Sequence, residues 1–186
     1  MRISDQHSTY VLQLDRLELV IAPAEAPPFK VAAQVEEQDV ALLLGTDEVI
    51  HQPGDKPVWY LAHKLASQTL QQPGDLLLRQ GRPLRLLAIV HDFDQEPSWN
   101  SAWVESALGK IAELIEERQL NSLALPLLAT RHGRVELDEC LALVSRALLQ
   151  QPPTCLTRIW LVVEDDRRDR VFARLQTIVS GMVEPH

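Results

Sequence analysis

Cysteine is scarce in this sequence: only Cys140 and Cys155 are present, and they do not form a closely spaced pair. A zinc-binding module or a small disulfide-stapled domain needs cysteines, or cysteines with histidines, at short regular spacings. Both classes are therefore excluded. We expect two reduced thiols in a cytoplasmic protein that carries neither a bound metal nor a cofactor.

Long apolar runs and an excess of positive charge are also missing. No stretch is long and apolar enough to span a bilayer, and the opening residues MRISDQHSTY lack the basic and then apolar order of a secretory signal. The 18 lysines and arginines are outnumbered by 26 aspartates and glutamates, which gives a formal net charge of −8. We expect neither membrane association nor general nucleic-acid binding, because the latter needs a basic surface.

The chain has 186 residues, enough for one domain with a full hydrophobic core. No linker, repeat or low-complexity segment divides it. We therefore expect a single domain over residues 1–186. The sequence leaves the oligomeric state open.

Short apolar blocks alternate with segments of helical periodicity along the chain. The blocks predict strands over residues 16–22, 39–44, 75–80, 83–93, 123–128 and 157–164. The periodic segments predict helices over residues 57–70, 99–118, 137–149 and 166–179. Residues 23–38 begin with a stretch rich in proline and alanine and then resemble a short helix. This order predicts an α/β fold, a three-layer α/β/α sandwich with a mixed, mostly parallel central sheet, in which 75–79 and 84–91 form a hairpin-like pair.

Ligands of such folds bind beyond the carboxyl ends of the parallel strands. Four polar segments follow predicted strands and are expected to meet there: residues 45–47, 91–92, 129–134 and 164–166. One of them joins a strand to a helix and consists of Thr130, Arg131, His132, Gly133 and Arg134. Its backbone N–H groups and two arginines suit an anion such as a phosphate. A solvated surface loop accounts for the same residues, and both interpretations stay open.

From residue 75 to residue 175 the order of blocks resembles a macro domain, with a few anchor motifs. Ala88-Ile89-Val90-His91 is similar to the family's V-I-H at a strand end, and LPLLAT (125–130) to its F-P-A-I-S-T. LDE (137–139) is similar to the L-E-E that starts the next helix. The resemblance implies the macro fold and a ligand related to ADP-ribose. Some members of the family hydrolyse ADP-ribosyl linkages or ADP-ribose phosphates.

The ligand motifs of that family are replaced at most positions. LVIAPAE lacks the aspartate that holds adenine in the family, and Leu43 and Thr46 stand where its N-A-A-N motif has asparagines. The glycine-rich loop for ribose and pyrophosphate is HQPGDKP, with the single Gly54, and the second phosphate loop is residues 130–134. The resemblance therefore implies ligand contacts at Gly45, Thr46, Gly54 and residues 130–134, with reduced or altered capacity for ADP-ribose.

Three residues are candidates for chemistry at this site. His91 carries an imidazole, the side chain most used for proton transfer near neutral pH. Asp47 and Asp55 flank the loop where the family has its catalytic features, and either is placed to position a water. Each also has a structural use, the histidine as a buried strand-end residue and the aspartates in turns or helix caps. A metal held by His91, Asp92, Asp94 and His132 has no support from ligand spacing.

The sequence therefore predicts a macro-domain-like protein that binds a nucleotide-like or phosphorylated small ligand, related to ADP-ribose, in the strand-end cleft. Two alternatives stay open. The first is an ADP-ribosyl hydrolase or phosphatase that uses the same cleft, and the second is a macro fold that serves as a protein-interaction module.

Overall fold

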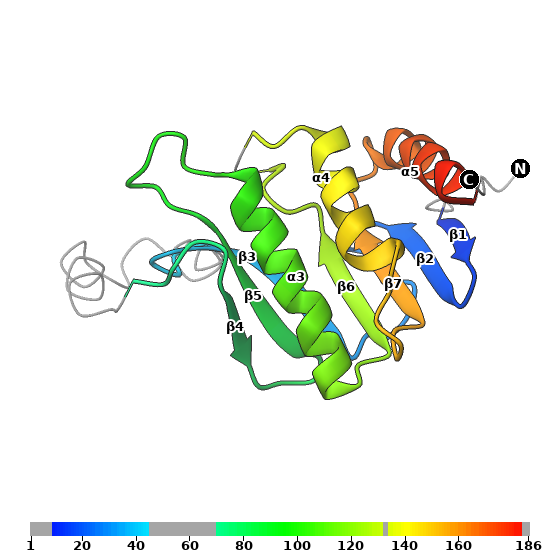
Figure 1. Ribbon diagram of the computed structural model, residues 1–186, viewed down its shortest axis with the longest axis horizontal. Helices are drawn as coiled ribbons and strands as arrows, with labels where there is room; N and C mark the ends of the chain where they lie inside the picture. Colours follow the sequence, from blue (N-terminus) through cyan, green and yellow to red (C-terminus); the bar gives the residue numbers. More distant parts are fainter. Residues whose placement is uncertain (1–8, 45–69, 132–133, 184–186) are drawn as a thin grey trace, which may run out of the picture.

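The computed structural model describes residues 9–44, 70–131 and 134–183, and within these ranges seven strands form one sheet (Figure 1). The strands are β1 (Tyr10–Leu14), β2 (Leu17–Ala22), β3 (Ala33–Asp39), β4 (Leu76–Arg79), β5 (Leu84–His91), β6 (Ser122–Pro126) and β7 (Arg158–Val162). Their order across the sheet is β1-β2-β7-β6-β3-β5-β4. The five central strands run parallel, while β1 and β4 pair antiparallel at the two edges. The predicted mixed, mostly parallel sheet is confirmed, and so is the antiparallel pairing of β4 with β5.

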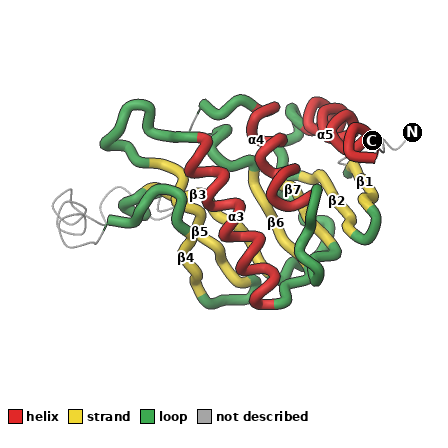
Figure 2. Tube along the Cα trace, viewed as in Figure 1, coloured by secondary structure: helices red, strands yellow, loops and turns green. Residues whose placement is uncertain are grey.

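Among the described residues, three α-helices pack on one face of the sheet: α3 (Ser101–Arg118), α4 (Leu137–Val144) and α5 (Arg168–Val183). Helix α4 continues into a π-helical turn, η1 (Ser145–Leu149). Figure 2 shows α3 and α4 crossing in front of the central strands. Within the described residues, no helix combines the length and the apolar character that a membrane crossing requires. The predicted helix 57–70 lies outside the described residues except for its last position.

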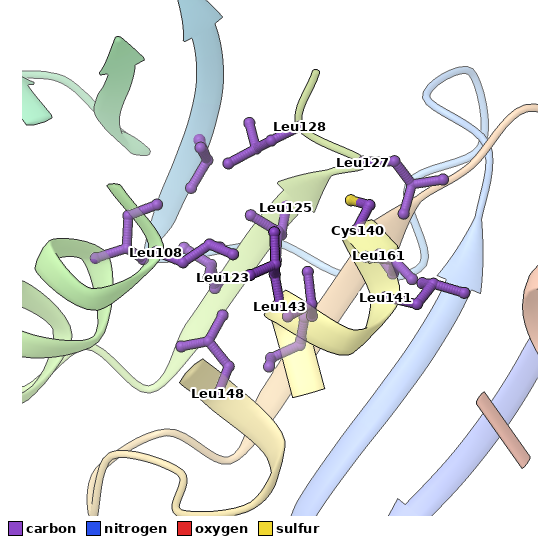
Figure 3. Close-up of a cluster of buried hydrophobic side chains, with 14 of the residues drawn as sticks. Leu108, Leu123, Leu125, Leu127, Leu128, Cys140, Leu141, Leu143, Leu148 and Leu161 are labelled. Carbon is purple, nitrogen blue, oxygen red and sulfur yellow. The ribbon is translucent and has the colours of Figure 1, made fainter. Parts of the chain in front are cut away.

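Leucine dominates the core between the sheet and α4. Leu123 and Leu125 of β6 and Leu161 of β7 pack with Leu141 of the helix, and Cys140 lies in the same cluster (Figure 3). Full burial of a leucine side chain contributes about 1.5–3 kcal/mol to folding. This cluster fixes the helix against β6 and β7, and it thereby fixes the loop that joins β6 to α4.

Helix α3 begins later than the apolar pattern predicts. Its N-cap is Asn100, whose side chain accepts the N–H of Ala102 at 2.8 Å. Trp99 lies before the helix and pairs with His91 in an isolated β-bridge. Trp99 and Trp103 are only half-buried. The buried face of the helix consists of Val104, Ala107, Leu108, Ile111 and Ile115.

The strand predicted over residues 39–44 is wrong. The strand is β3, which ends at Asp39 and lies in the region predicted to resemble a short helix. The chain turns after β3 because the Asp39 carboxylate accepts three backbone N–H groups, each at 2.7 Å, from Ala41, Leu43 and Leu44. The apolar run that follows Asp39 is therefore a turn wrapped around a buried carboxylate.

Strands β3 and β5 pair in regular register up to Gln38 and Ile89, and then the register shifts so that Asp39 lies opposite His91. Val90 is the extra residue, which makes this a β-bulge. The bulge turns His91 toward the face of the sheet that carries Glu37, and the two side chains meet there. A strand with the sequence VEEQD is tolerated in the centre of the sheet because its acidic side chains find such partners.

Candidate functional site

A cavity of about 440 Å³ opens at the carboxyl ends of strands β2, β7, β6 and β3. Its walls come from separate parts of the chain, which meet at one edge because these strands are parallel. Its volume lies in the range of small-ligand sites. The lining residues are Ala24, Glu25, Glu36, Glu37, Gln38, Pro126, Leu127, Thr130, Arg131, Val162, Val163, Glu164 and Arg167.

The loop that follows β6 forms one wall of this cavity. The carbonyl of Leu127 accepts the N–H of Thr130 at 3.3 Å and its hydroxyl at 2.8 Å, which closes a tight turn. Ala129 has a left-handed backbone, with φ 58°, an uncommon conformation for a residue that has a Cβ. Its N–H donates to the Oε2 atom of Glu37 at 2.8 Å. The N–H groups of Ala129 and Thr130 are thus both engaged within the protein.

Glu37 of β3 joins three elements through one carboxylate. While Oε2 receives the N–H of Ala129, Oε1 contacts Nε2 of His91 at the end of β5. Because an ionised carboxylate can only accept, the proton of this contact is assigned to the histidine. The Glu37 side chain is 11% exposed and lines the cavity, whereas the His91 side chain is fully buried behind it. In the described part of the chain, His91 thus lies behind Glu37 and contacts the cavity wall through it.

Four carboxylates and two guanidinium groups line the cavity. Glu36 accepts two hydrogen bonds of 2.5 Å from Nε and Nη2 of Arg85, and this contact raises the pKa of the Arg85 guanidinium. Arg131 and Arg167 approach Glu164 at 4.0 and 3.9 Å, and their side chains are 75% and 42% exposed. Exposed pairs at such distances are weak. Both guanidinium groups are therefore free to turn toward an anion at the mouth of the cavity.

The predicted ligand-binding residues fall into three groups. Thr130 and Arg131 line the cavity. Arg134 lines an adjoining recess of about 470 Å³, which also includes Thr130, Arg167 and Arg170. The others lie outside the described residues: Gly45, Thr46, Gly54, His132 and Gly133. The candidates for catalysis Asp47 and Asp55 lie outside them as well.

The residues just after His91 form a local turn. The ring of Phe93 stacks on that of His91, with centroids 5.8 Å apart. The Asp92 carboxylate accepts the N–H of Asp94 at 3.1 Å and the side-chain amide of Gln95 at 2.5 Å. Asp92 is thus engaged within its own turn. In the described ranges, no group of three or more His, Cys, Asp or Glu side chains is arranged to hold a metal ion.

Cys140 lies in the first turn of helix α4, where the charge of Glu37 acts on the pKa of its thiol. Burial, and to a smaller extent the charges of Glu37 and Glu139, together raise the pKa of the Cys140 thiol to about 12. The group is therefore a neutral thiol near pH 7 and a poor nucleophile. The chemistry that the described walls of the cavity offer comes from carboxylates, a threonine hydroxyl, the amide of Gln38 and arginines.

A larger recess of about 1110 Å³ adjoins the cavity along the other face of the sheet. Its walls include the rings of Phe29 and Trp160, and the Trp160 indole N–H is fixed by the Ala22 carbonyl at 3.0 Å. Lys30 and Arg82 supply positive charge there. The shared lining residues Ala24, Pro126 and Val162 connect the two spaces, so a ligand longer than a single phosphate group has room to extend.

Sequence reasoning missed Glu37, because the strand that carries it was assigned to a loop and a short helix. The signal was the pair Glu36-Glu37 directly after Val35, just before the apolar run that was mistaken for the strand. The placement of Leu43 and Thr46 at the family's asparagine positions assumed that wrong strand, and it loses its basis because β3 ends at Asp39.

No family model matches the sequence, and no curated protein was found to be related to it by sequence. Solved structures do match. The chain is similar to the macrodomain of Oceanobacillus iheyensis with ADP, with a TM-score of 0.69 and 13% identity over 94% of this chain and 98% of that one. A variant of the same macrodomain with ADPR matches with a TM-score of 0.65 and 16% identity, over 93% and 100% of the two chains. The Trypanosoma brucei macrodomain in complex with ADP matches with a TM-score of 0.61 and 16% identity, over 87% and 70%.

Proposed function

We propose that this chain, a divergent macro domain in its fold, binds a nucleotide-like or phosphorylated small ligand related to ADP-ribose in the strand-end cavity. The fold predicted from the motifs is confirmed by structural similarity that covers 94% of the chain. A cavity at the carboxyl ends of parallel strands is where sheets of this kind bind their ligands.

The presence of Arg131 and Arg167 at the mouth of that cavity carries the proposal. Guanidinium groups bind phosphates through paired N–H donors, and the ion pairs that these two form with Glu164 among the described residues are long and exposed, so they are easily exchanged for a phosphate. Thr130 adds a hydroxyl on the same wall. Similar macrodomains have been solved with ADP and with ADPR, which makes these two compounds the first to test.

Calorimetric titration of the wild-type protein with ADP-ribose, ADP and inorganic phosphate tests the proposal. We expect ADP-ribose to bind and to raise Tm, because a ligand at 100 times its Kd adds about 2.7 kcal/mol to the stability of the folded state. Absence of binding for all three compounds at millimolar concentration would contradict the proposal.

The double variant Arg131→Ala, Arg134→Ala is expected to abolish binding of ADP-ribose, because it removes two of the guanidinium groups that line the cavity and the adjoining recess. The matched control is Arg79→Ala, Arg118→Ala. It removes the same charge from exposed positions on β4 and at the end of α3 that do not line these spaces. An equal loss in both double variants would show that net charge, and not the cavity, governs binding.

A further inference from the structure

We infer that Glu37 determines which ligands the strand-end cavity binds. Its carboxylate accepts the N–H of Ala129, a donor that a phosphate would otherwise use. In place of a phosphate, the carboxylate accepts a hydroxyl group of the ligand. This inference rests on the proposed function, since it concerns which end of a phosphorylated ligand enters the inner part of the cavity.

The position of the carboxylate keeps a phosphate away from the backbone N–H of Ala129 at the start of the loop. The N–H of Ala129 donates to Oε2 of Glu37 at 2.8 Å, and the N–H of Thr130 donates to the Leu127 carbonyl. An incoming phosphate would have to displace Glu37 to reach the first of these donors. It would also bring negative charge against negative charge in a half-buried place, where such repulsion is poorly screened.

The carboxylate is also held firmly. Nε2 of the fully buried His91 contacts Oε1, and the bulge at Val90 and the stacked ring of Phe93 set the orientation of that imidazole. Each carboxylate oxygen has two lone pairs, so each still accepts a second hydrogen bond after its internal one. The exposed part of Glu37 thus offers a ligand fixed acceptors and no donor.

Charge is distributed unevenly along the cavity. The charge of Glu36 is balanced by the bidentate contact with Arg85, whereas Glu37 lies at the inner end against a histidine. Arg131 and Arg167 are positive groups of its exposed part, since their side chains are 75% and 42% exposed while that of Glu37 is 11% exposed. The ligand class that fits has phosphate toward the arginines and an uncharged, hydroxyl-bearing sugar toward Glu37. A nucleoside diphosphate joined to a sugar has this form, and a nucleotide that ends in a phosphate does not.

The test is the ratio of the two dissociation constants, Kd for ADP over Kd for ADP-ribose, measured by calorimetry on wild-type protein and on Glu37→Gln. The glutamine keeps the size of the side chain and removes its charge. We expect the ratio to fall by at least about tenfold in Glu37→Gln, because the terminal phosphate of ADP no longer meets a carboxylate. The matched control Glu113→Gln removes one exposed charge from helix α3, at a position that does not line the cavity or its adjoining recesses, and should shift the ratio by less than about threefold.

A second measurement needs no variant. On wild-type protein, ADP-ribose that carries a phosphate on its terminal ribose should bind at least about tenfold more weakly than ADP-ribose itself. Equal or tighter binding would overturn the inference, and so would a ratio that stays the same in folded Glu37→Gln or changes equally in Glu113→Gln. If wild-type protein binds ADP-ribose and these shifts are absent, the inference fails while the proposed function stands. If neither wild-type protein nor Glu37→Gln binds any of the probes, both fail.

Discussion

Replacement of Asp39 by alanine is expected to destabilise the protein strongly, although the residue stands in a turn. Its side chain is 1% exposed, and its two oxygens accept three backbone N–H groups, each at 2.7 Å, from Ala41, Leu43 and Leu44. In the alanine variant these donors lose their acceptor. The turn that ends β3 next to the cavity then loses the three hydrogen bonds to the Asp39 carboxylate that hold its backbone.

The exposure of the three donors sets the size of the effect. Ala41 is 9% exposed, so its N–H is left without a water and costs about 1–3 kcal/mol. Leu43 and Leu44 are half-buried, so solvent replaces part of what they lose, and each contributes roughly 0.5–1 kcal/mol. Removal of a buried charge returns some of this cost. We expect a net loss of about 2–4 kcal/mol for Asp39→Ala and about half of that for Asp39→Asn, which keeps one acceptor oxygen.

Urea unfolding at 25 °C, followed by tryptophan fluorescence, measures this loss directly. The matched control is Asp94→Ala, an exposed aspartate in the turn after β5, for which the change should stay within about 0.5 kcal/mol. A loss below about 1 kcal/mol for Asp39→Ala, with an unchanged m-value, would show that the carboxylate does not hold the turn.

Two further predictions concern other buried features. Because the pKa of Cys140 is about 12 in the folded protein and 9.0 when unperturbed, the unfolded thiol ionises first. Wild-type protein should therefore lose about 1.4 kcal/mol of stability per pH unit above pH 9, relative to Cys140→Ala, and parallel pH profiles of unfolding would refute this. Gly74 has φ +85° and a Cβ there would lie 3.1 Å from Ser106, so Gly74→Ala should cost about 1–3 kcal/mol in urea unfolding. The control Gly109→Ala is helical, has open space around its Cβ position and should gain about 0.5–1 kcal/mol; a similar sign for both would contradict the argument.

Most of the sheet could be predicted from the sequence, because four of the central strands are apolar runs whose burial on both faces dictates their composition. Strands β2, β5, β6 and β7 all coincide with predicted blocks. Strand β1 was missed because it lies at an edge, where exposed and half-buried residues alternate and leave a weak signal. Strand β3 was missed for the opposite reason: it is central, yet its charged side chains have the composition of a surface segment.

The site was harder to predict than the fold. Its position at the strand ends follows from parallel topology, and Thr130 and Arg131 were placed on the cavity by that rule alone. Glu37 could not be found in this way, because its importance depends on His91 and Ala129, which are distant in sequence and meet it only in the folded chain. Local patterns report what a residue prefers, whereas a buried carboxylate is explained only by the donors around it.

The contact between His91 and Glu37 requires the one inserted residue of strand β5, Val90. This contact therefore depends on the length of the strand more than on its composition. In strict alternation the imidazole would project from the opposite side of the sheet to Glu37, whose carboxylate would then keep the N–H of Ala129 but lose the contact with His91. Shortening β5 by one residue would therefore separate the ionisable pair while changing almost nothing in the amino-acid content of the strand. Among relatives of this protein, insertions and deletions in this strand should accordingly be rarer than substitutions, and a lost insertion should be accompanied by loss of the acidic partner.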